Sequence, residues 1–458
     1  MPRHRTPNER LPKLLDEAGW SGTALARAVN GLGRAQGLAL RYDRTSVAHW
    51  VKGSCPRQPV PALVAQVLST RIGRLVTEAE TGLAARTGPS RPIAAELVED
   101  DDPVRRLTHL VKADSDRQQR RLLHHLVYDP GFRTERRRPA REDVVAPRHT
   151  REAPGPGAIS DMAGVFFQQR ERYGGTQGRT ALVAYLADYA VPVLTRAASA
   201  SQRRGLSREL ARATHVLAMM CEDSNLHGLA QRYHGVGLDL ARNADDDALT
   251  ATVLRALSVQ ASRLGHDRRA LTLAHEAMRA AHHCELSPVR AFVLAQRAVA
   301  HAGAGLRREA VDDLSAAERE LGASTPDAGH YFGWYPPAAL RFQEGQALLA
   351  LGDKRAGIRA LEASVSTRAP EQRRARVLTR ARLAQARLSL GHVEDGCHDY
   401  GLFLDEVSHL SCRRATSTLT TLHAALFPFH RYRPARSLLA RSAHVRDEVT
   451  RHDPPHRS

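Results

Sequence analysis

The sequence predicts an all-α protein built from more than one domain. Aromatic residues make up only 5% of the chain, and runs rich in alanine and leucine recur along it. Both features favour helices over β-sandwiches, whose strands are enriched in aromatic and β-branched side chains. A length of 458 residues suits two or three domains. We expect a helical domain over 1–80, a charged linker with one helix over 81–160, and helical repeats over 161–450.

The first domain begins with a series of short amphipathic helices. Gly19 ends the first helix and Ser21 can cap the second, in which Leu25 and Val29 face the core. Pro61 suits the first turn of a later helix. The apolar residues of the first and of this later helix repeat at the spacing of one buried face: Leu11, Leu14, Leu15 and Ala18, then Val60, Leu63, Val64, Val67 and Leu68.

Residues 43–53 read as a short helix with one buried and one polar face. Val47 and Trp50 stand three positions apart, so they can pack inward together. Gly53 ends the helix, where a residue without Cβ can adopt a left-handed turn. The opposite face carries the side chains that could enter a major groove, Arg44, Thr45 and His49. Two basic residues beside the turn could reach phosphates, Lys52 and Arg57.

These helices resemble the helix-turn-helix domain of the Xre and phage-repressor class over residues 11–68. The matching stretches are Leu14–Ser21, Thr23–Ala26, Thr45–Gly53 and Pro56-Arg57. The resemblance implies base contacts from Arg44, Thr45 and His49. It implies contacts to the DNA backbone from Ser46 and Lys52, and from the start of the second helix near Ser21 and Thr23.

One segment departs from the helix-turn-helix pattern. The turn between the second and third helices of that class is a few residues long, whereas Asn30 to Tyr42 separates them here. This glycine-rich, basic insertion could form a wing that touches phosphate. It could equally disturb the docking angle, or belong to a domain that no longer reads DNA and serves only as an interaction module.

Residues 81–160 have the composition of a linker, with many prolines, glycines and charges. An acidic patch over 99–102 precedes one expected helix near 103–128. An arginine-rich run over 133–151 follows, and it could track a DNA backbone. A solvated linker of mixed charge explains the same run, because acidic residues lie within it.

From about residue 161 a local motif recurs, in which a glycine is followed by charged residues and then by an alanine-rich apolar stripe. The glycines are Gly265, Gly305, Gly352 and Gly391, which lie 40, 47 and 39 residues apart. The motif resembles tetratricopeptide-type repeats, whose unit is a helix pair of about 34 residues with a glycine between the two helices. The longer spacing predicts a divergent tetratricopeptide-like α-solenoid.

An aromatic loop between repeats contains four of the chain's 22 aromatic residues. Its members are Tyr331, Phe332, Trp334 and Tyr335. They could line a ligand or peptide groove of the solenoid. Packing of an irregular junction between repeats explains them as well, and we favour that interpretation.

The composition and the motifs limit the functions that we expect. The chain lacks a phosphate-binding loop, a nucleophile elbow and a His-Glu-x-x-His motif, so we expect no enzyme and no cofactor. A net charge of +18 suits nucleic acid, although the excess of arginine over lysine also fits a GC-rich genome.

The five cysteines form no Cys-x-x-Cys pair, so neither a disulfide framework nor a zinc site is implied. With no secretory signal and no apolar run of about 20 residues, we expect a cytoplasmic protein with no membrane partner.

The order of a helix-turn-helix domain and a repeat-rich half is similar to that of actinomycete regulators that restrain sporulation and antibiotic production. This resemblance implies a transcriptional regulator that binds double-stranded DNA as a homodimer. The repeats would sense a ligand, bind a peptide or protein partner, or dimerise. The alternative is a scaffold or co-regulator that binds protein and no specific DNA.

Overall fold

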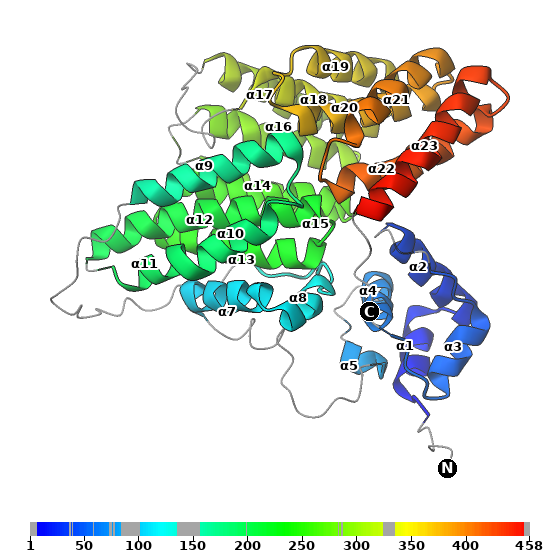
Figure 1. The fold of residues 1–458 in the computed structure, drawn as a ribbon, viewed down its shortest axis with the longest axis horizontal. Helices are drawn as coiled ribbons and strands as arrows, with labels where there is room; N and C mark the ends of the chain where they lie inside the picture. The colour runs from blue at the N-terminus through cyan, green and yellow to red at the C-terminus, as the bar shows by residue number, and fades with distance from the viewer. Residues whose placement is uncertain are drawn as a thin grey trace. The chain divides into compact units, whose positions relative to one another are not determined.

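The structure is a computed structural model in which every regular element of the described part is a helix, with no strand there. The described residues are 7–35, 38, 40–57, 59–72, 76, 78–83, 101–134, 156–197, 199–282, 284, 287–323 and 335–452. Contacts divide the chain into two compact units. The first unit comprises residues 1–100, 116–135 and 225–229, and the second comprises 101–115, 136–224 and 230–458. Figure 1 labels their helices.

The first unit contains a small helical core. It is formed by apolar side chains that include the predicted Leu11, Leu15, Val47 and Trp50, all buried. The helices α1, α4 and α5 pack together, and α2 packs on α3 and α4. Its helices are α1 (Arg10–Ala18), α2 (Gly22–Ala35), α3 (Arg44–Val51), α4 (Val60–Ile72), α5 (Glu78–Thr81) and α8 (Arg117–His124).

The predicted helix boundaries of this unit are confirmed at three positions. Gly19 closes α1 with a φ of 63°, and Gly53 follows α3 with a φ of 91°. Both values lie in the left-handed region, where glycine carries no Cβ penalty. The hydroxyl of Ser21 accepts a hydrogen bond from the Ala24 N–H at 3.2 Å, as an N-cap does.

The insertion over 30–42 continues α2 instead of forming a separate loop from its first residue. The helix runs on to Ala35. The Asn30 amide then receives the returning chain: its Nδ2 donates to the Tyr42 carbonyl at 2.7 Å, and its Oδ1 accepts from the Tyr42 N–H at 2.9 Å. Leu40 fills the space beside Gly33, where a Cβ would lie 2.5 Å from its Cδ1. These contacts join the two ends of the insertion to each other, and Leu40 and Tyr42 also pack against the domain core.

The single helix expected near 103–128 is two helices, α7 (Pro103–Ser115) and α8. The break comes at Asp116, which takes an extended backbone conformation and caps α8. Its carboxylate accepts hydrogen bonds from the N–H groups of Gln118 and Gln119 at 2.9 and 2.8 Å. An aspartate in this position competes with the helical backbone and starts a new helix. Most of the arginine-rich run, from 135 to 151, lies outside the described residues.

The second unit is an array of helices that follow one another as antiparallel pairs. Neighbouring pairs are α14 with α15, α16 with α17, α18 with α19, and α20 with α21. The helices after α7 are α9 (Pro156–Tyr173), α10 (Arg179–Tyr185), α11 (Val191–Thr195), α12 (Ala200–Asp223), α13 (His227–Asn243), α14 (Asp247–Arg263), α15 (Asp267–Ala281), α16 (Ser287–Gly303), α17 (Arg307–Gly322), α18 (Pro337–Ala350), α19 (Lys354–Ser366), α20 (Arg373–Ser389), α21 (Val393–Val407), α22 (Arg413–Leu426) and α23 (Arg433–His452). A π-helical turn (Leu186–Ala190) joins α10 to α11, and a short 3-10 helix (Phe427–Phe429) follows α22.

The four motif glycines lie between the two helices of each pair, as the repeat pattern predicts. Gly265, Gly305, Gly352 and Gly391 have φ values of 78°, 78°, 83° and 79°. One further pair, α12 with α13, has the same turn with Asn225 at a φ of 59°. Asparagine tolerates the left-handed region better than most residues. A search for glycine therefore misses this pair.

A chain of buried polar side chains runs across the first helices of three pairs. Gln296 of α16 donates to the Ser258 hydroxyl of α14 at 3.2 Å, and its carbonyl accepts from Gln343 of α18 at 3.1 Å. Tyr335 donates to Gln343 at 2.8 Å. Because buried polar groups need partners, this chain fixes the register of α14, α16 and α18.

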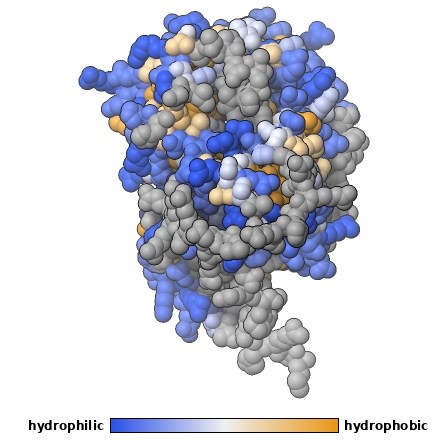
Figure 2. Space-filling view, turned by 90° about the vertical axis from the view of Figure 1, so that its left-hand side faces the viewer, coloured by the Kyte–Doolittle hydropathy of each residue, from blue (hydrophilic) through white to orange (hydrophobic). Residues whose placement is uncertain are grey.

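Hydrophilic residues dominate the described part of one face of the molecule (Figure 2), with apolar residues in small patches between them. Within the described part of the chain, no helix is long and apolar enough to cross a membrane.

Candidate functional sites

The start of α3 is fixed by a reciprocal capping box. The Asp43 carboxylate accepts a hydrogen bond from the Ser46 N–H at 2.8 Å, and the Ser46 hydroxyl accepts one from the Asp43 N–H at 3.4 Å. The hydrogen bonds from Ser46 lower the pKa of Asp43, so this carboxylate stays charged. The Ser46 hydroxyl also donates to that carboxylate at 2.7 Å. Ser46, a predicted backbone contact, thus already serves the helix start.

One face of α3 is anchored and the other faces solvent. Trp50 is buried and meets Tyr42 edge-on, with ring centroids 5.1 Å apart. Val47 packs near Gly22, where a Cβ would lie 3.4 Å from its Cγ1. The predicted base-contacting residues Arg44, Thr45 and His49 are all exposed on the opposite face.

The basic side chains around α3 are available to a partner. Within the described residues, none of them forms an ion pair with a carboxylate. They are Arg27, Arg41, Arg44, Lys52 and Arg57, and all five are exposed. Ser21 and Thr23, at the start of α2, are exposed as well. The structure therefore places all the predicted first-unit contact residues on α2, α3 or the turn after α3.

The second unit contains a half-open cavity of about 850 Å³. It is lined by α9 and by the first helices of successive pairs, from α12 to α20, together with the start of α22. This volume lies within the range of small-molecule binding sites. Its apolar wall contains Met219, Phe292, Tyr335, Phe342 and Leu378.

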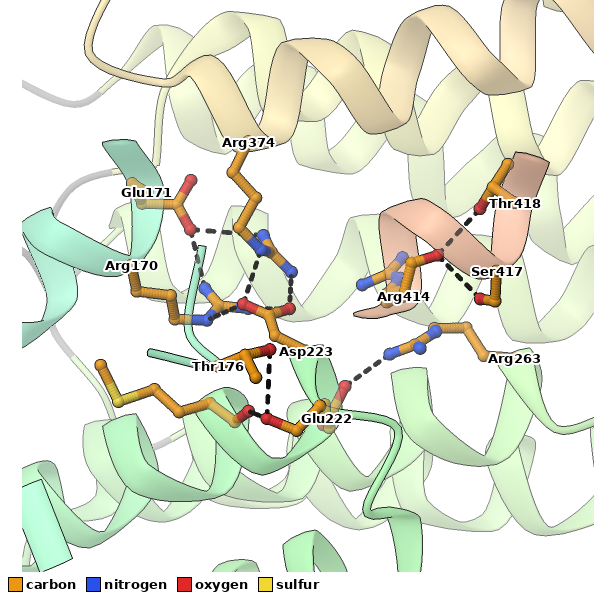
Figure 3. A network of polar contacts seen from close by, with 12 residues as sticks. Arg170, Glu171, Thr176, Glu222, Asp223, Arg263, Arg374, Arg414, Ser417 and Thr418 are labelled. Carbon is orange, nitrogen blue, oxygen red and sulfur yellow. Dashed lines mark hydrogen bonds and ion pairs between the residues drawn. The ribbon is translucent and has the colours of Figure 1, made fainter. Parts of the chain in front are cut away.

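A network of ion pairs (Figure 3) includes three residues of the cavity lining, Arg170, Glu171 and Arg374. Asp223 of α12 accepts two hydrogen bonds from Arg374 of α20, at 2.8 and 2.5 Å, and pairs with Arg170 of α9 at 3.0 Å. Glu171 bridges the same two arginines, at 2.7 Å to Arg170 and 3.4 Å to Arg374. Burial raises the pKa of Asp223, but Arg170 and Arg374 outweigh it and hold the pKa below its usual value. The network joins residues 151 positions apart.

A second buried chain runs from the network to the cavity. Glu222 pairs with Arg263 at 2.6 Å and accepts from His234 at 3.1 Å. The Nδ1 atoms of His234 and His215 lie 3.3 Å apart, and His215 lines the cavity. Burial, and next the neighbouring His234, lower the pKa of His215 well below its usual value. His215 is therefore neutral near pH 7.

The predicted aromatic loop is described only at Tyr335. This side chain is buried, lines the cavity and packs on Phe292 with ring centroids 5.0 Å apart. Tyr331, Phe332 and Trp334 lie outside the described residues.

Sequence reasoning missed the charged residues of the cavity. Arginines in the first helices of the pairs have the spacing of ordinary solvent-facing residues, so nothing local distinguishes Arg255 or Arg374. The available signal was the repeat itself, because in an array of helix pairs the first helices line one face. No group of three or more metal-ligating side chains occurs among the described residues.

Residues 11–84 match the family model described as the SP15 N-terminal domain. The match covers the stretch that contains α1 to α5 and leaves the second unit outside it. No curated protein matches the chain.

Proposed function

We propose that the protein is a sequence-specific regulator that binds double-stranded DNA through α3. The observation that carries this proposal is the two-faced α3. Val47 and Trp50 hold it on the domain core, while Arg44, Thr45 and His49 project from it without ion-pair partners in the described part. A helix held in this way can enter a major groove and present polar side chains to base edges.

The residues around α3 suit two kinds of contact, some with bases and others with phosphates. Arg44 is suited to the O6 and N7 acceptors of guanine, and Thr45 and His49 can contact neighbouring bases. Lys52 and Arg57 follow α3 and suit phosphate contacts, as does the start of α2 near Ser21 and Thr23. Asp43 already occupies the start of α3, so a phosphate is better received at α2.

We further propose that the protein binds DNA as a dimer and that the helix pairs act as a sensor or as the dimerisation surface. A single domain of this size buries little DNA surface, so useful affinity requires two copies on two half-sites. We assign the helix-turn-helix class to residues 11–68 and a tetratricopeptide-like solenoid to the helix pairs. Left-handed turns between paired helices, at Gly265, Gly305, Gly352 and Gly391, support the second assignment. The solenoid is the candidate sensor or dimerisation surface.

Recovery of genomic DNA fragments by the purified protein tests the proposal. Wild type is compared with the double variant Arg44→Ala/His49→Ala at near-physiological salt. Lys13→Ala is the matched control, because it removes an exposed positive charge from α1, which packs on α4 and α5. We expect wild type and the control to recover one shared palindromic motif, and the double variant to lose it.

Equal recovery by all three proteins, or no motif, would reject specific DNA binding. The alternative would then be a protein-binding scaffold, for which the long array of helix pairs provides the surface.

A further inference from the structure

Three arginines at the cavity form no ion pair with another described residue. Arg255, Arg368 and Arg414 line the cavity, and within the described residues none of their guanidinium groups meets a carboxylate or a hydrogen-bond acceptor. The Nε atoms of Arg255 and Arg368 are buried without a partner. Figure 3 shows Arg414 with contacts only at its carbonyl, which accepts from Ser417 and Thr418.

The acidic groups nearby are already engaged. Asp223 and Glu171 are bound by Arg170 and Arg374, and Glu222 is bound by Arg263 and His234. Glu371, the other carboxylate of the lining, is exposed to solvent. The cavity therefore has an excess of positive charge that the described protein does not neutralise.

The positions of these arginines make their charge costly. Burial lowers the pKa of Arg255 and of Arg368 to about 10 each, and that of Arg414 to about 9. All three still carry a full charge near neutral pH, because arginine does not deprotonate there. All three side chains are half-buried, so their charge is only partly solvated, and a counter-ion at this place would be favoured.

Aromatic rings stand beside two of the three arginines. The Arg255 guanidinium lies 3.7 Å from the centroid of the Phe292 ring, and that of Arg368 lies 5.9 Å from the centroid of Phe342. Tyr335 packs on Phe292. A ligand that fits here combines a negative group for the guanidinium forks with an apolar or flat part for the rings.

We propose that this cavity is a binding site for a small organic anion, one that carries a carboxylate, sulfonate or phosphate group on an apolar or aromatic body. The group would bind at Arg255, Arg368 and Arg414, which all line the cavity, and would supply contacts that they lack. This assignment does not depend on whether α3 reads DNA, because it rests only on the second unit.

Two fluorescent probes test the proposal on the full chain. Anilinonaphthalene sulfonate carries a negative group, whereas N-phenylnaphthylamine is a neutral compound of similar shape. We expect wild type to bind the sulfonate at least ~10-fold more tightly than the neutral probe, since charge-assisted hydrogen bonds add to ring contacts. Arg255→Met and Arg368→Met should each remove most of this preference and leave the neutral probe unchanged. Equal binding of the two probes by wild type overturns the proposal.

Thermal unfolding separates a ligand-binding role from a structural one. Without ligand, Arg255→Met should melt at the same temperature as wild type or higher, because it removes an unpaired charge. Arg359→Met, an exposed arginine of α19 outside the lining, is the control and should keep the probe preference. If Arg255→Met melts well below wild type and the probe preference survives, the arginines are structural and the proposal fails.

Competition distinguishes the negative groups. Pyrophosphate and benzoate are added against the bound sulfonate probe, with sodium chloride at equal ionic strength as reference. Displacement by pyrophosphate points to a phosphate ester, and displacement by benzoate to an aromatic carboxylate. If sodium chloride displaces the probe as well as either compound does, the site only attracts anions in general and the proposal fails.

Discussion

The protein carries unpaired arginines in two settings, on the surface around α3 and inside the cavity of the second unit. Arg44 and Arg57 stand in solvent, where water already stabilises their charge. Arg255 and Arg414 lie among protein atoms, and burial lowers the pKa of both. An exposed arginine is uninformative by itself, and its interpretation depends on the helix that presents it. A half-buried arginine without an ion pair supports our proposal of an anionic ligand, because its charge is only partly solvated.

The largest expected effect is a loss of stability when the ion pairs of Asp223 are removed. Asp223→Asn should destabilise the protein by about 3–5 kcal/mol, because it leaves Arg170 and Arg374 buried without their main counter-charge. Unfolding by urea measures this loss. The control Glu371→Gln removes an exposed carboxylate of the same lining and should change stability by less than about 0.5 kcal/mol. If the two variants were equally stable, the free energy of unfolding would not depend on whether the lost carboxylate is buried or exposed.

The next largest expected effect is a loss of DNA binding when exposed basic residues around α3 are removed. Arg44→Ala should weaken binding to the recovered DNA motif by about 1–3 kcal/mol and relax the preference at one base position. Lys52→Ala should weaken binding to all sequences alike and reduce the salt slope by about 1. Fluorescence anisotropy titrations at several salt concentrations measure both. If the two variants behave identically, α3 supplies only charge and the proposed base contacts are wrong.

A smaller effect concerns the neutral histidine of the cavity. The pKa of His215 is lowered in the folded state, so above the unfolded pKa of about 6.5 it is neutral in both states. As the pH falls below 6.5 only the unfolded chain takes up the proton, so stability falls by up to about 1.4 kcal/mol per pH unit. His215→Gln should make this dependence shallower between pH 6.5 and 5, as urea unfolding at each pH would show. An unchanged slope would contradict the neutral state of His215.

The smallest effect concerns the turns of the helix pairs. Gly391→Ala places a Cβ on a residue with a φ of 79°, so it should destabilise by about 1 kcal/mol although nothing lies within 4 Å. Gly157→Ala, in an open position of α9, is the control and should be neutral or slightly stabilising. Thermal melts compare the two. If Gly391→Ala is as stable as its control, the turn does not need its left-handed conformation.

Local features of this protein could be predicted from the sequence because their causes are local. The cap at Ser21, the left-handed turns after Gly19 and Gly53, and the four turn glycines all depend on a few neighbouring residues. Helical spacing likewise identified the buried residues of α1 and α4. The all-helical fold class followed from the same signals.

The remaining features depend on contacts between distant residues. Arg374 pairs with Asp223 across 151 positions, and no spacing rule relates them. Asn30 holds Tyr42 through side-chain hydrogen bonds across 12 positions, and α2 runs beyond Asn30 to Ala35. Asn225 replaces glycine in one turn, which hid a helix pair. That three of the cavity arginines form no ion pair within the described part of the chain can be seen only from contacts in the three-dimensional structure.

The contacts of α9 have a consequence for how this array can evolve. Open solenoids gain or lose repeats freely, because each unit contacts only its neighbours. Here α9 packs on both α12 and α20, and the backbone of Tyr173 and Thr176 is hydrogen-bonded to Ser411 at 2.7 and 3.0 Å. Duplication or deletion of one helix pair would move these anchor points apart or into collision. We therefore expect these contacts to constrain the number of helix pairs between α12 and α20 more tightly than the residues within them.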